Sequence, residues 1–509
     1  MYSKVISCAV LGVDGTLISV EADVNDGLPI FTMVGYLSSS VKEAGERVRT
    51  ALKNSGYHMP PKRITINLSP ANLKKDGSGF DLPVAIAVVL AIGVIPVIDI
   101  DKTVIIGELS LNGEVKPVNG ILPMIYHAGN NGITRCIVPL ANCNEAALVK
   151  RMEVIGVTSL ADTIDYIQGL KDIKPWITRQ DYCEVVTNST SDFSEIKGQE
   201  MLKRGMEIAA AGFHNVLMTG VAGAGKSMLA KRMPTIMPEL SFEESIEVTK
   251  IYSISGLLNE REGLIRKRPF RSPHHTISTH ALVGGGIVPK PGEITLAHNG
   301  VLFLDELPEF NKNVLEVLRQ PLEDRCISVS RLNASYTFPA DFMLLAAMNP
   351  CPCANTKKCT CTPLQKKRYQ NKVSTALLDR IDINIEVKPV TYEELFELGD
   401  GESSAAIRCR VEAAREIQRR RYADENIKFN SQLEGKILKK YIRLGDKEQA
   451  FLEDAYKTKE LSARGIDRIL KLARTIADIG NSEEIKCIHL QEAVFYRNSS
   501  VVREEDFNV

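Results

Sequence analysis

The sequence carries no surplus of charge of either sign: 63 Lys and Arg residues balance 63 Asp and Glu residues, so the formal net charge is +0 at pH 7. A neutral chain has no long-range attraction to nucleic acid, and any contact with DNA must come from a local basic patch. Hydrophobic residues at 44% and charged residues at 25% are typical of a soluble globular protein. The composition therefore predicts a globular protein that recognises its partners through local surfaces.

The sequence also lacks a membrane span and a secretion signal. Its longest uncharged run, Leu82–Ile98, is interrupted by Pro83, Gly93 and Pro96 and is at the short limit for a span, so we expect a buried helix there. The first residues combine one lysine with a broken apolar run, which indicates a first strand. The 11 cysteines are too sparse for a secreted disulfide scaffold. We therefore place the protein in the reducing cytoplasm.

The length of 509 residues predicts about three domains. Residues 1–170 contain short β-like runs, such as Val104–Leu109, and helix-like runs between turn signals, which predicts an α/β or α+β domain. Residues 171–193 are polar without clear periodicity and are expected to be a linker. Residues 194–389 hold the main motifs, and residues 390–509 carry apolar residues at helical spacing. We therefore expect an α/β fold with a parallel-sheet core and a C-terminal helical domain.

The clearest motif is a glycine-rich loop between an apolar run and a helix, within Asn215–Arg232. It follows the pattern G-x-x-x-x-G-K-[ST], which is typical of phosphate-binding P-loops. Glycines let successive backbone N–H groups face a phosphate, and the following helix presents its positive end to the anion. We therefore predict an ATP site with Mg²⁺, in which the lysine reaches the phosphates and the serine binds the metal. The residues expected to line this site are Gly220, Gly223, Ala224, Gly225, Lys226 and Ser227.

Two apolar strands downstream of this loop end in polar residues. The first ends in Asp305 and Glu306, where Asp305 would hold Mg²⁺ through water and Glu306 would polarise the attacking water. The second ends in Asn349, which could hydrogen-bond the γ-phosphate or the attacking water. The alternative for Asn349 is an ordinary loop-forming Asn-Pro pair.

Two arginines could complete the site. Arg380 stands between Asp379 and Asp382, and its guanidinium could stabilise transition-state charge on the γ-phosphate of a neighbouring subunit. The alternative is an internal ion pair between Arg380 and an aspartate. Arg464 stands near the start of an expected helix and could reach the nucleotide of its own chain, or it could be a solvated surface arginine.

Two stretches could contact DNA. Arg325–Phe338 alternates like two strands around a polar turn, which predicts a hairpin. It resembles the pore hairpin of minichromosome-maintenance helicases, and Arg331 matches the basic residue near the tip of that hairpin. The cluster Arg266–Arg271 combines basic residues with an aromatic, which suits backbone binding and base stacking. The alternative for this cluster is a solvated charged loop.

Four cysteines crowd one loop as two C-x-C pairs: Cys351, Cys353, Cys359 and Cys361. Thiolates this close repel one another unless they are protonated, oxidised or bound to a metal, and a tetrahedral Zn²⁺ site is the attractive option in a reducing cytosol. Free thiols or a redox pair stay open, because C-x-C is tighter than the usual zinc spacing. Four histidines are expected to be structural or hydrogen-bonding residues: His274, His275, His280 and His298.

Several segments together resemble the magnesium-chelatase-like AAA+ ATPases of the YifB/ComM family, and the resemblance covers almost the whole chain. The segments that carry it are Gly77–Pro83, Ile196–Gln199, Phe270–Thr276, Gly292–Gly300, Asn349–Cys353 and Leu461–Arg464. One departure is Val221-Ala222, where relatives usually carry two prolines. These two residues touch phosphate only through their backbone, so we expect activity to survive.

The resemblance implies a ring, expected to be a homo-hexamer, that hydrolyses ATP between subunits. It matches Arg380 to the arginine finger, Asn349 to the first sensor and Arg464 to the second. The family includes a helicase that drives branch migration when transforming DNA is integrated, which implies single-stranded or branched DNA as the substrate. A protein-remodelling or chelatase-type motor with a protein client stays open, because family membership does not determine the substrate.

Two N-terminal segments, Lys74–Ala91 and Ile106–Ala128, are similar to the proteolytic domain of Lon proteases. Those enzymes use a serine from the first segment and a lysine from the second, and Ser78 could be offered as the nucleophile. The lysine position falls in Asn119–Pro123, which contains no lysine. Without a base to take its proton, a serine hydroxyl is a weak nucleophile. We therefore expect a Lon-like domain without peptidase activity that serves as a scaffold or partner surface.

Overall fold

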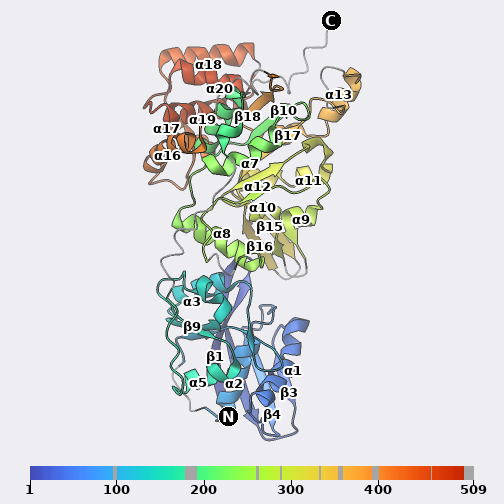
Figure 1. Ribbon diagram of the computed structural model, residues 1–509, viewed down its shortest axis with the longest axis vertical. Helices are drawn as coiled ribbons and strands as arrows, with labels where there is room; N and C mark the ends of the chain where they lie inside the picture. The colour runs from blue at the N-terminus through green and yellow to red at the C-terminus, as the bar shows by residue number, and fades with distance from the viewer. Residues whose placement is uncertain are drawn as a thin grey trace.

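The chain forms an elongated molecule with two bodies, and its N-terminus lies at the far end of one of them (Figure 1). The computed structural model describes residues 1–95, 100–177, 192–259, 263–286, 289–331, 334–353, 359–392, 401–459 and 461–497. Most of the predicted linker 171–193 therefore lies outside the described residues. Its first part packs on the N-terminal body, where the Trp176 backbone N–H donates to the Val154 carbonyl at 2.7 Å.

The N-terminal body is built on a mixed sheet. The long hairpin of β1 and β2 pairs antiparallel with β4, and parallel strands extend the sheet on both sides. The strand order is β3 (Phe31–Val34), β4 (Arg63–Ser69), β2 (Asp14–Asn25), β1 (Tyr2–Leu11), β5 (Thr103–Ile105), β8 (Arg135–Pro139) and β9 (Glu153–Val157). Its helices are α1 (Ser39–Asn54), α2 (Asp81–Ile92), α3 (Ile121–Asn130), α4 (Cys143–Ala146) and α5 (Leu160–Ile167).

The predicted buried helix in the uncharged run is confirmed as α2, which is buried along almost its entire length. Among the described residues, no helix is long and apolar enough to cross a membrane. The predicted strand Val104–Leu109 was wrong in extent, because it divides into β5 and β6 (Glu108–Leu109). Gly107 breaks it: its N–H donates to the Gly79 carbonyl, and its own carbonyl accepts from the Leu82 N–H. β6 then pairs with β7 (Val115–Lys116).

The second body contains the predicted parallel sheet. All five strands run in one direction, and the three interior strands are completely buried, as nearly continuous apolar runs require. The order is β11 (Phe270–Arg271), β14 (Val301–Leu304), β17 (Met343–Met348), β10 (Val216–Gly220) and β18 (Ile383–Val387). Helices around this sheet are α6 (Glu200–Gly212), α7 (Lys226–Ile236), α8 (Phe242–Ile254), α9 (Thr279–Val283), α10 (Glu293–Leu296), α11 (Lys312–Glu316), α12 (Arg319–Asp324), α13 (Pro363–Gln370) and α14 (Thr375–Leu378).

The C-terminal part is helical, as predicted, and covers one face of this sheet. A single hydrophobic cluster joins Met218 of the sheet to Val411, Leu472 and Ala493 of the C-terminal helices, all fully buried. These helices are α16 (Ser404–Arg421), α17 (Gly435–Tyr441), α18 (Asp446–Thr458), α19 (Ala463–Ile479) and α20 (Cys487–Arg497). They lie at the end of the molecule opposite the N-terminal body (Figure 1).

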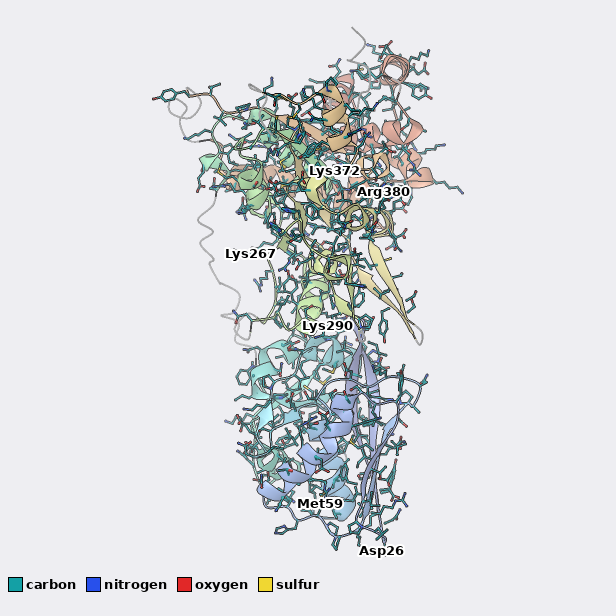
Figure 2. The ribbon with its side chains drawn as sticks, turned by 90° about the vertical axis from the view of Figure 1, so that its right-hand side faces the viewer. Asp26, Met59, Lys267, Lys290, Lys372 and Arg380 are labelled. Carbon is teal, nitrogen blue, oxygen red and sulfur yellow. The ribbon has the colours of Figure 1, made fainter. Side chains whose placement is uncertain are left out.

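Two hairpins leave the core. The predicted hairpin is confirmed as β15 (Cys326–Arg331) paired antiparallel with β16 (Ala334–Pro339), and a smaller one joins β12 (Gly284–Gly285) to β13 (Lys290–Pro291). The turn between β1 and β2 packs beside the larger hairpin, since a Cβ added at Gly12 would lie 3.7 Å from Tyr336 Cδ1. Asp26 and Met59 mark the far end of the N-terminal body, and Arg380 lies in the other body (Figure 2).

Helix α8 holds the two bodies together. Its Ser253 carbonyl accepts from the Gly120 N–H at 3.2 Å, and the Ser253 hydroxyl donates to the buried Glu145 carboxylate. Lys250 Nζ lies 3.8 Å from the centroid of the Tyr126 ring, a cation–π contact. The N-terminal body therefore docks on α8 through the segment that carries the lysine in Lon proteases.

A buried polar network fastens the C-terminal helices to the sheet. Asp382, at the start of β18, lies 3.3 Å from His214 Nδ1 and 3.7 Å from Arg468 Nε, and His214 Nε2 lies 2.8 Å from Thr475 Oγ1. Burial acts to raise the pKa of Asp382, but the His214 hydrogen bond and the charges of Arg468 and Lys471 outweigh it and lower the pKa to about 2. The carboxylate therefore stabilises the fold only while it is ionised.

We predict that Asp382→Asn destabilises the protein by about 2 kcal/mol at pH 7, because the native pKa lies below the unfolded value of about 3.9. The contribution is present above about pH 4 and is lost as the pH falls through about 2. Urea unfolding followed by circular dichroism at pH 7 and pH 3 measures it, with exposed Asp379→Asn as the matched control. An equal deficit for Asp382→Asn at both pH values would contradict the prediction.

Candidate nucleotide site

The P-loop follows the carboxyl end of β10, where the chain turns sharply into α7. Gly223 and Gly225 have φ of 78° and 88°, a left-handed backbone that favours glycine. Gly220 is required for a different reason, since a Cβ added there would lie 2.4 Å from the Val387 carbonyl oxygen. The loop and the start of α7 thus form the strand–loop–helix turn that suits a phosphate.

Lys226 links the P-loop to the second predicted strand. Its ammonium donates to the carbonyls of Gly220 at 2.5 Å and Val221 at 2.9 Å, and to Asn349 Oδ1 at 3.1 Å. Burial lowers the pKa of Lys226, while the charges of Asp305 and Glu306 act in the opposite direction. The structure therefore brings Asn349 to the P-loop lysine, where both could face a phosphate.

Ser227 and Asp305 provide the oxygen atoms expected for a divalent cation. The Ser227 hydroxyl donates to Asp305 Oδ2 at 2.5 Å, so a hydroxyl and a carboxylate from two elements meet at one point. Oxygen ligands of this kind suit Mg²⁺, which keeps several waters and takes one or two protein oxygens with the substrate phosphates. The donor set therefore fits Mg²⁺ held by Ser227 and, through water, Asp305.

Glu306 begins the turn after β14 in an unusual conformation. Its φ is 53°, a left-handed backbone that costs a non-glycine residue energy and tends to persist at functional sites. The side chain is 54% exposed, and its Oε2 lies 3.5 Å from His275 Nδ1. Sequence reasoning missed His275 as a partner of this glutamate, although it stands in Phe270–Thr276, one of the segments that carry the family resemblance.

Arg380 and Arg464 lie elsewhere, at the opposite end of the sheet. Both line a cavity of about 460 Å³ with Asn215, the residue that precedes β10. β10 has five residues, and a strand rises about 3.3 Å per residue, so its two ends lie roughly 16 Å apart. The expectation that Arg464 reaches the nucleotide of its own chain is therefore not met, because α19 places it with Arg380 away from the P-loop.

The guanidinium of Arg380 is only partly satisfied. It pairs with Glu323 and donates to the Ala376 carbonyl, whereas its buried Nε has no hydrogen-bond partner among the described residues. The ion pair is therefore with Glu323, and not with either neighbouring aspartate as the alternative interpretation had it. The cavity is also lined by Arg325, Arg468 and Lys471, and each of them pairs with a carboxylate of the same cavity: Asp341, Asp382 and Glu434 respectively. The lining therefore carries charges of both signs.

The basic cluster Arg266–Arg271 differs from its expected role. Arg268 is buried and donates to Glu244 Oε2 at 3.0 Å and to the Asn299 carbonyl at 2.8 Å. Arg271 forms a bidentate pair with Glu293. Both guanidiniums are neutralised by carboxylates of the same chain and so stabilise the fold. Of the basic residues in this cluster, only residues 266 and 267 are exposed.

Arg331 ends strand β15, and its side chain lies outside the described part of the chain, as do residues 332 and 333. The four histidines form no metal cluster among the residues that the structure describes, in which a single group, the four cysteines, could hold a metal ion. His298 is buried and structural: its Nε2 lies 3.3 Å from Glu247, and its Nδ1 accepts from the Asp341 N–H at 3.1 Å.

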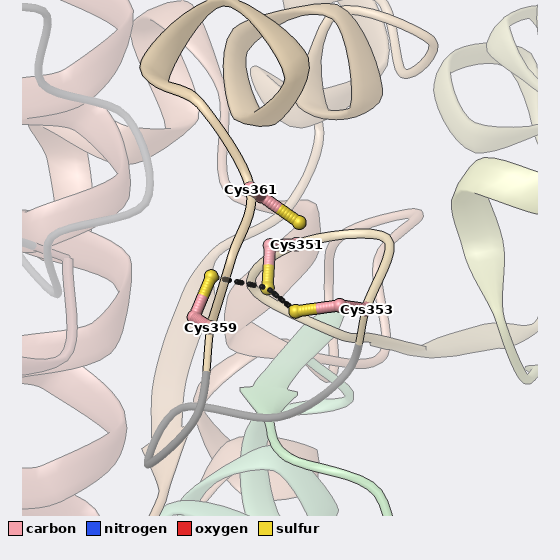
Figure 3. Close-up of side chains that lie close together, drawn as sticks. All are labelled: Cys351, Cys353, Cys359 and Cys361. Carbon is pink, nitrogen blue, oxygen red and sulfur yellow. Dashed lines mark hydrogen bonds between the residues drawn. The ribbon is translucent and has the colours of Figure 1, made fainter.

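The four cysteine sulfurs converge in space, all within 4.8 Å of one another (Figure 3). Cys351 Sγ lies 3.3 Å from Cys353 Sγ and 3.6 Å from Cys359 Sγ. Burial, together with the neighbouring thiols, raises the pKa of Cys351 to about 12. The structure thus brings the two C-x-C pairs together, two residues beyond Asn349.

Three stretches match domains described for magnesium chelatase. Residues 192–395 match magnesium chelatase subunit ChlI, residues 20–142 match the subunit ChlI family of Mg-chelatase, and residues 401–497 match the ChlI C-terminal family. The chain is 42% identical over 500 residues to Competence protein ComM of Haemophilus influenzae, covering 97% of each protein. It is 42% identical to the uncharacterized protein YifB of Escherichia coli, covering 96% of each. It is also 35% identical over 133 residues to Lon protease 2 of Bacillus subtilis, covering 25% of this chain and 23% of that enzyme.

Proposed function

The chain belongs to the magnesium-chelatase-like AAA+ ATPases of the YifB/ComM family, and from this premise we propose that it is an ATP-hydrolysing motor that acts on DNA as a ring. The observation that carries the proposal is the separation of the nucleotide machinery between the two ends of one sheet. Lys226, Ser227 and Asn349 gather at the P-loop end, whereas Arg380 and Arg464 line a cavity at the other. A second copy of the chain could place its Arg380 and Arg464 at the P-loop of the first copy.

In this mechanism each residue has a distinct task. Lys226 and the loop N–H groups bind the β- and γ-phosphates, and Ser227 and Asp305 hold Mg²⁺, which supplies positive charge at the phosphates. Glu306 takes the proton of the attacking water, while Asn349 orients that water or the γ-phosphate. Arg380 and Arg464 of the next subunit face the γ-phosphate and stabilise the charge that develops on it.

DNA is the proposed substrate, and the protein is placed in the cytoplasm. The hairpin of β15 and β16 projects from the second body (Figure 2), with Ile327 and Phe338 buried where it joins the core. Arg331 ends its first strand, so a ring could present several such hairpins to a phosphate backbone. A relative that covers 97% of the chain is a competence protein. The alternative, a protein-remodelling motor, draws on the likeness to the 67 kDa subunit of a magnesium chelatase from Chlorobaculum parvum, 25% identical over 202 residues, 39% of this chain and 27% of that subunit.

The ring predicts complementation between two inactive variants. Lys226→Ala cannot bind the phosphates, and Arg380→Ala cannot assist its neighbour, so each should hydrolyse ATP at least about ten-fold more slowly than the wild type. Mixed rings should recover part of the activity, because the intact P-loop of one variant meets the intact arginine of the other. The double variant Lys226→Ala/Arg380→Ala, mixed in the same way, is the control. No recovery beyond that control would contradict a shared site.

The substrate is tested by measuring ATP turnover with single-stranded, duplex and four-way-junction DNA. We expect single-stranded or branched DNA to stimulate turnover several-fold, and Arg331→Ala to reduce the stimulation while the basal rate stays unchanged. The effect should weaken as salt rises, because phosphate contacts release counterions. Turnover that no DNA stimulates, together with no DNA binding at low salt, would favour the protein-client alternative.

A further inference from the structure

We propose that Cys351, Cys353, Cys359 and Cys361 bind one structural Zn²⁺ that holds the loop between β17 and α13 in place. A zinc ion with four thiolates has Zn–S distances of about 2.3 Å in a tetrahedron, which sets its sulfurs roughly 3.8 Å apart. The four sulfurs converge at comparable spacing: Cys351 Sγ lies 3.3 and 3.6 Å from two of the others, and no two of the four are more than 4.8 Å apart (Figure 3). One ion at that point can contact all of them.

The geometry favours a metal over the other options for these thiols. A disulfide requires a separation of about 2.05 Å, and Cys351 lies almost equally far from two partners, so no single pairing is preferred. Two C-x-C pairs also provide four ligands and no open position, which is typical of a structural and not a catalytic zinc site. Binding replaces four S–H bonds by four Zn–S bonds, and the protons go to the buffer.

The described residues around the cluster are unevenly covered: Cys351 is buried, whereas Cys353 is exposed and Leu364 of α13 is 59% exposed. Binding of a metal ion contributes folding free energy at such a site. The metal would tie the end of β17 to the start of α13, whose Gln370 Nε2 reaches back to the Pro350 carbonyl at 3.3 Å.

This tie fixes the position of Asn349. The asparagine stands two residues before Cys351 in the chain, and its Oδ1 contacts Lys226 Nζ at 3.1 Å. Losing the metal should therefore reduce ATP turnover more than ATP binding. The expected effect on turnover rests on the proposed ATP hydrolysis. The proposed binding of zinc does not depend on that function.

The test is the metal content of the full chain, purified without added metal and passed through gel filtration. We expect about one zinc per chain in the wild type and in Cys409→Ser, an exposed cysteine outside the cluster, and less than about a tenth in Cys359→Ser. Because loss of a ligand can itself impair folding, the wild type is also reconstituted with Co²⁺, which should show the absorption of a tetrahedral thiolate site. Three results would overturn the proposal: a folded wild type that contains no metal and whose thiols react rapidly, a disulfide among the four cysteines, or iron in place of zinc.

A second inference comes from a different contact: we infer that His275 positions Glu306. His275 Nδ1 lies 3.5 Å from Glu306 Oε2, and its ring packs edge-on against Phe310 at 6.4 Å and beside His274 at 4.1 Å. These neighbours hold the imidazole while the carboxylate extends into solvent. A base must be aimed at its water, and His275 is a polar side chain placed to restrict this carboxylate. The inference rests on the proposed role of Glu306 in ATP hydrolysis.

We expect His275→Ala to lower kcat for ATP about ten-fold with KM unchanged, and His275→Asn to restore part of it. In the Glu306→Gln background, His275→Ala should have no further effect, because residues that act as a unit are not additive. Normal turnover in Glu306→Gln would reject the proposed base itself. Loss of turnover in Glu306→Gln with full turnover in His275→Ala would reject only this inference.

Discussion

The common direction of the five core strands is the constraint on which the rest of the structure depends. Parallel strands bring all their carboxyl ends to one edge, so Gly220, Asp305 and Asn349 meet although they come from distant parts of the sequence. The same direction brings the amino ends together at the other edge, with Asn215, Asp382 and the cavity of Arg380. In the proposed ring, one sheet would therefore provide half of a nucleotide site at each edge, and two chains would be needed to complete one site.

The Lon-like N-terminal body contacts the second body through one of its own segments. In Lon proteases the segment equivalent to Asn119–Pro123 supplies a lysine, and here its Gly120 N–H bonds to Ser253 of α8. Gly120 has a φ of 81°, and a Cβ there would lie 2.7 Å from Val10 Cγ2, so close approach favours glycine at this position. The segment that is equivalent to the one with the lysine of Lon proteases therefore contacts the second body here.

The sequence predicted the elements that depend on local pattern. The P-loop, the apolar strands β14 and β17, the hairpin of β15 and β16, and helix α19 lie where periodicity and motif placed them. The resemblance to a known family extended this to the whole fold.

What the sequence could not predict depends on partners that are distant along the chain. Arg268 and Arg271 were assigned to a possible DNA-binding cluster. Their partners Glu244 and Glu293 are more than 20 positions away in the sequence, so the local pattern could not identify them. The sequence motif suggested that Arg464 lies beside the nucleotide of its own chain. Its location is set by the packing of α19, which places it with Arg380 instead. No spacing rule pairs His275 with Glu306, which lie 31 positions apart in the chain.

Helix α8 serves both bodies at once. Ser253 and Lys250 at its end contact the N-terminal body, and Glu244 at its start accepts from Arg268, which is anchored to the core at the Asn299 carbonyl. A boundary between sequence domains is therefore not a boundary between units of stability. Unfolding of the N-terminal body would remove the neighbours of one end of α8, and the disturbance would spread toward the sheet, so the two bodies should resist denaturation as one cooperative unit.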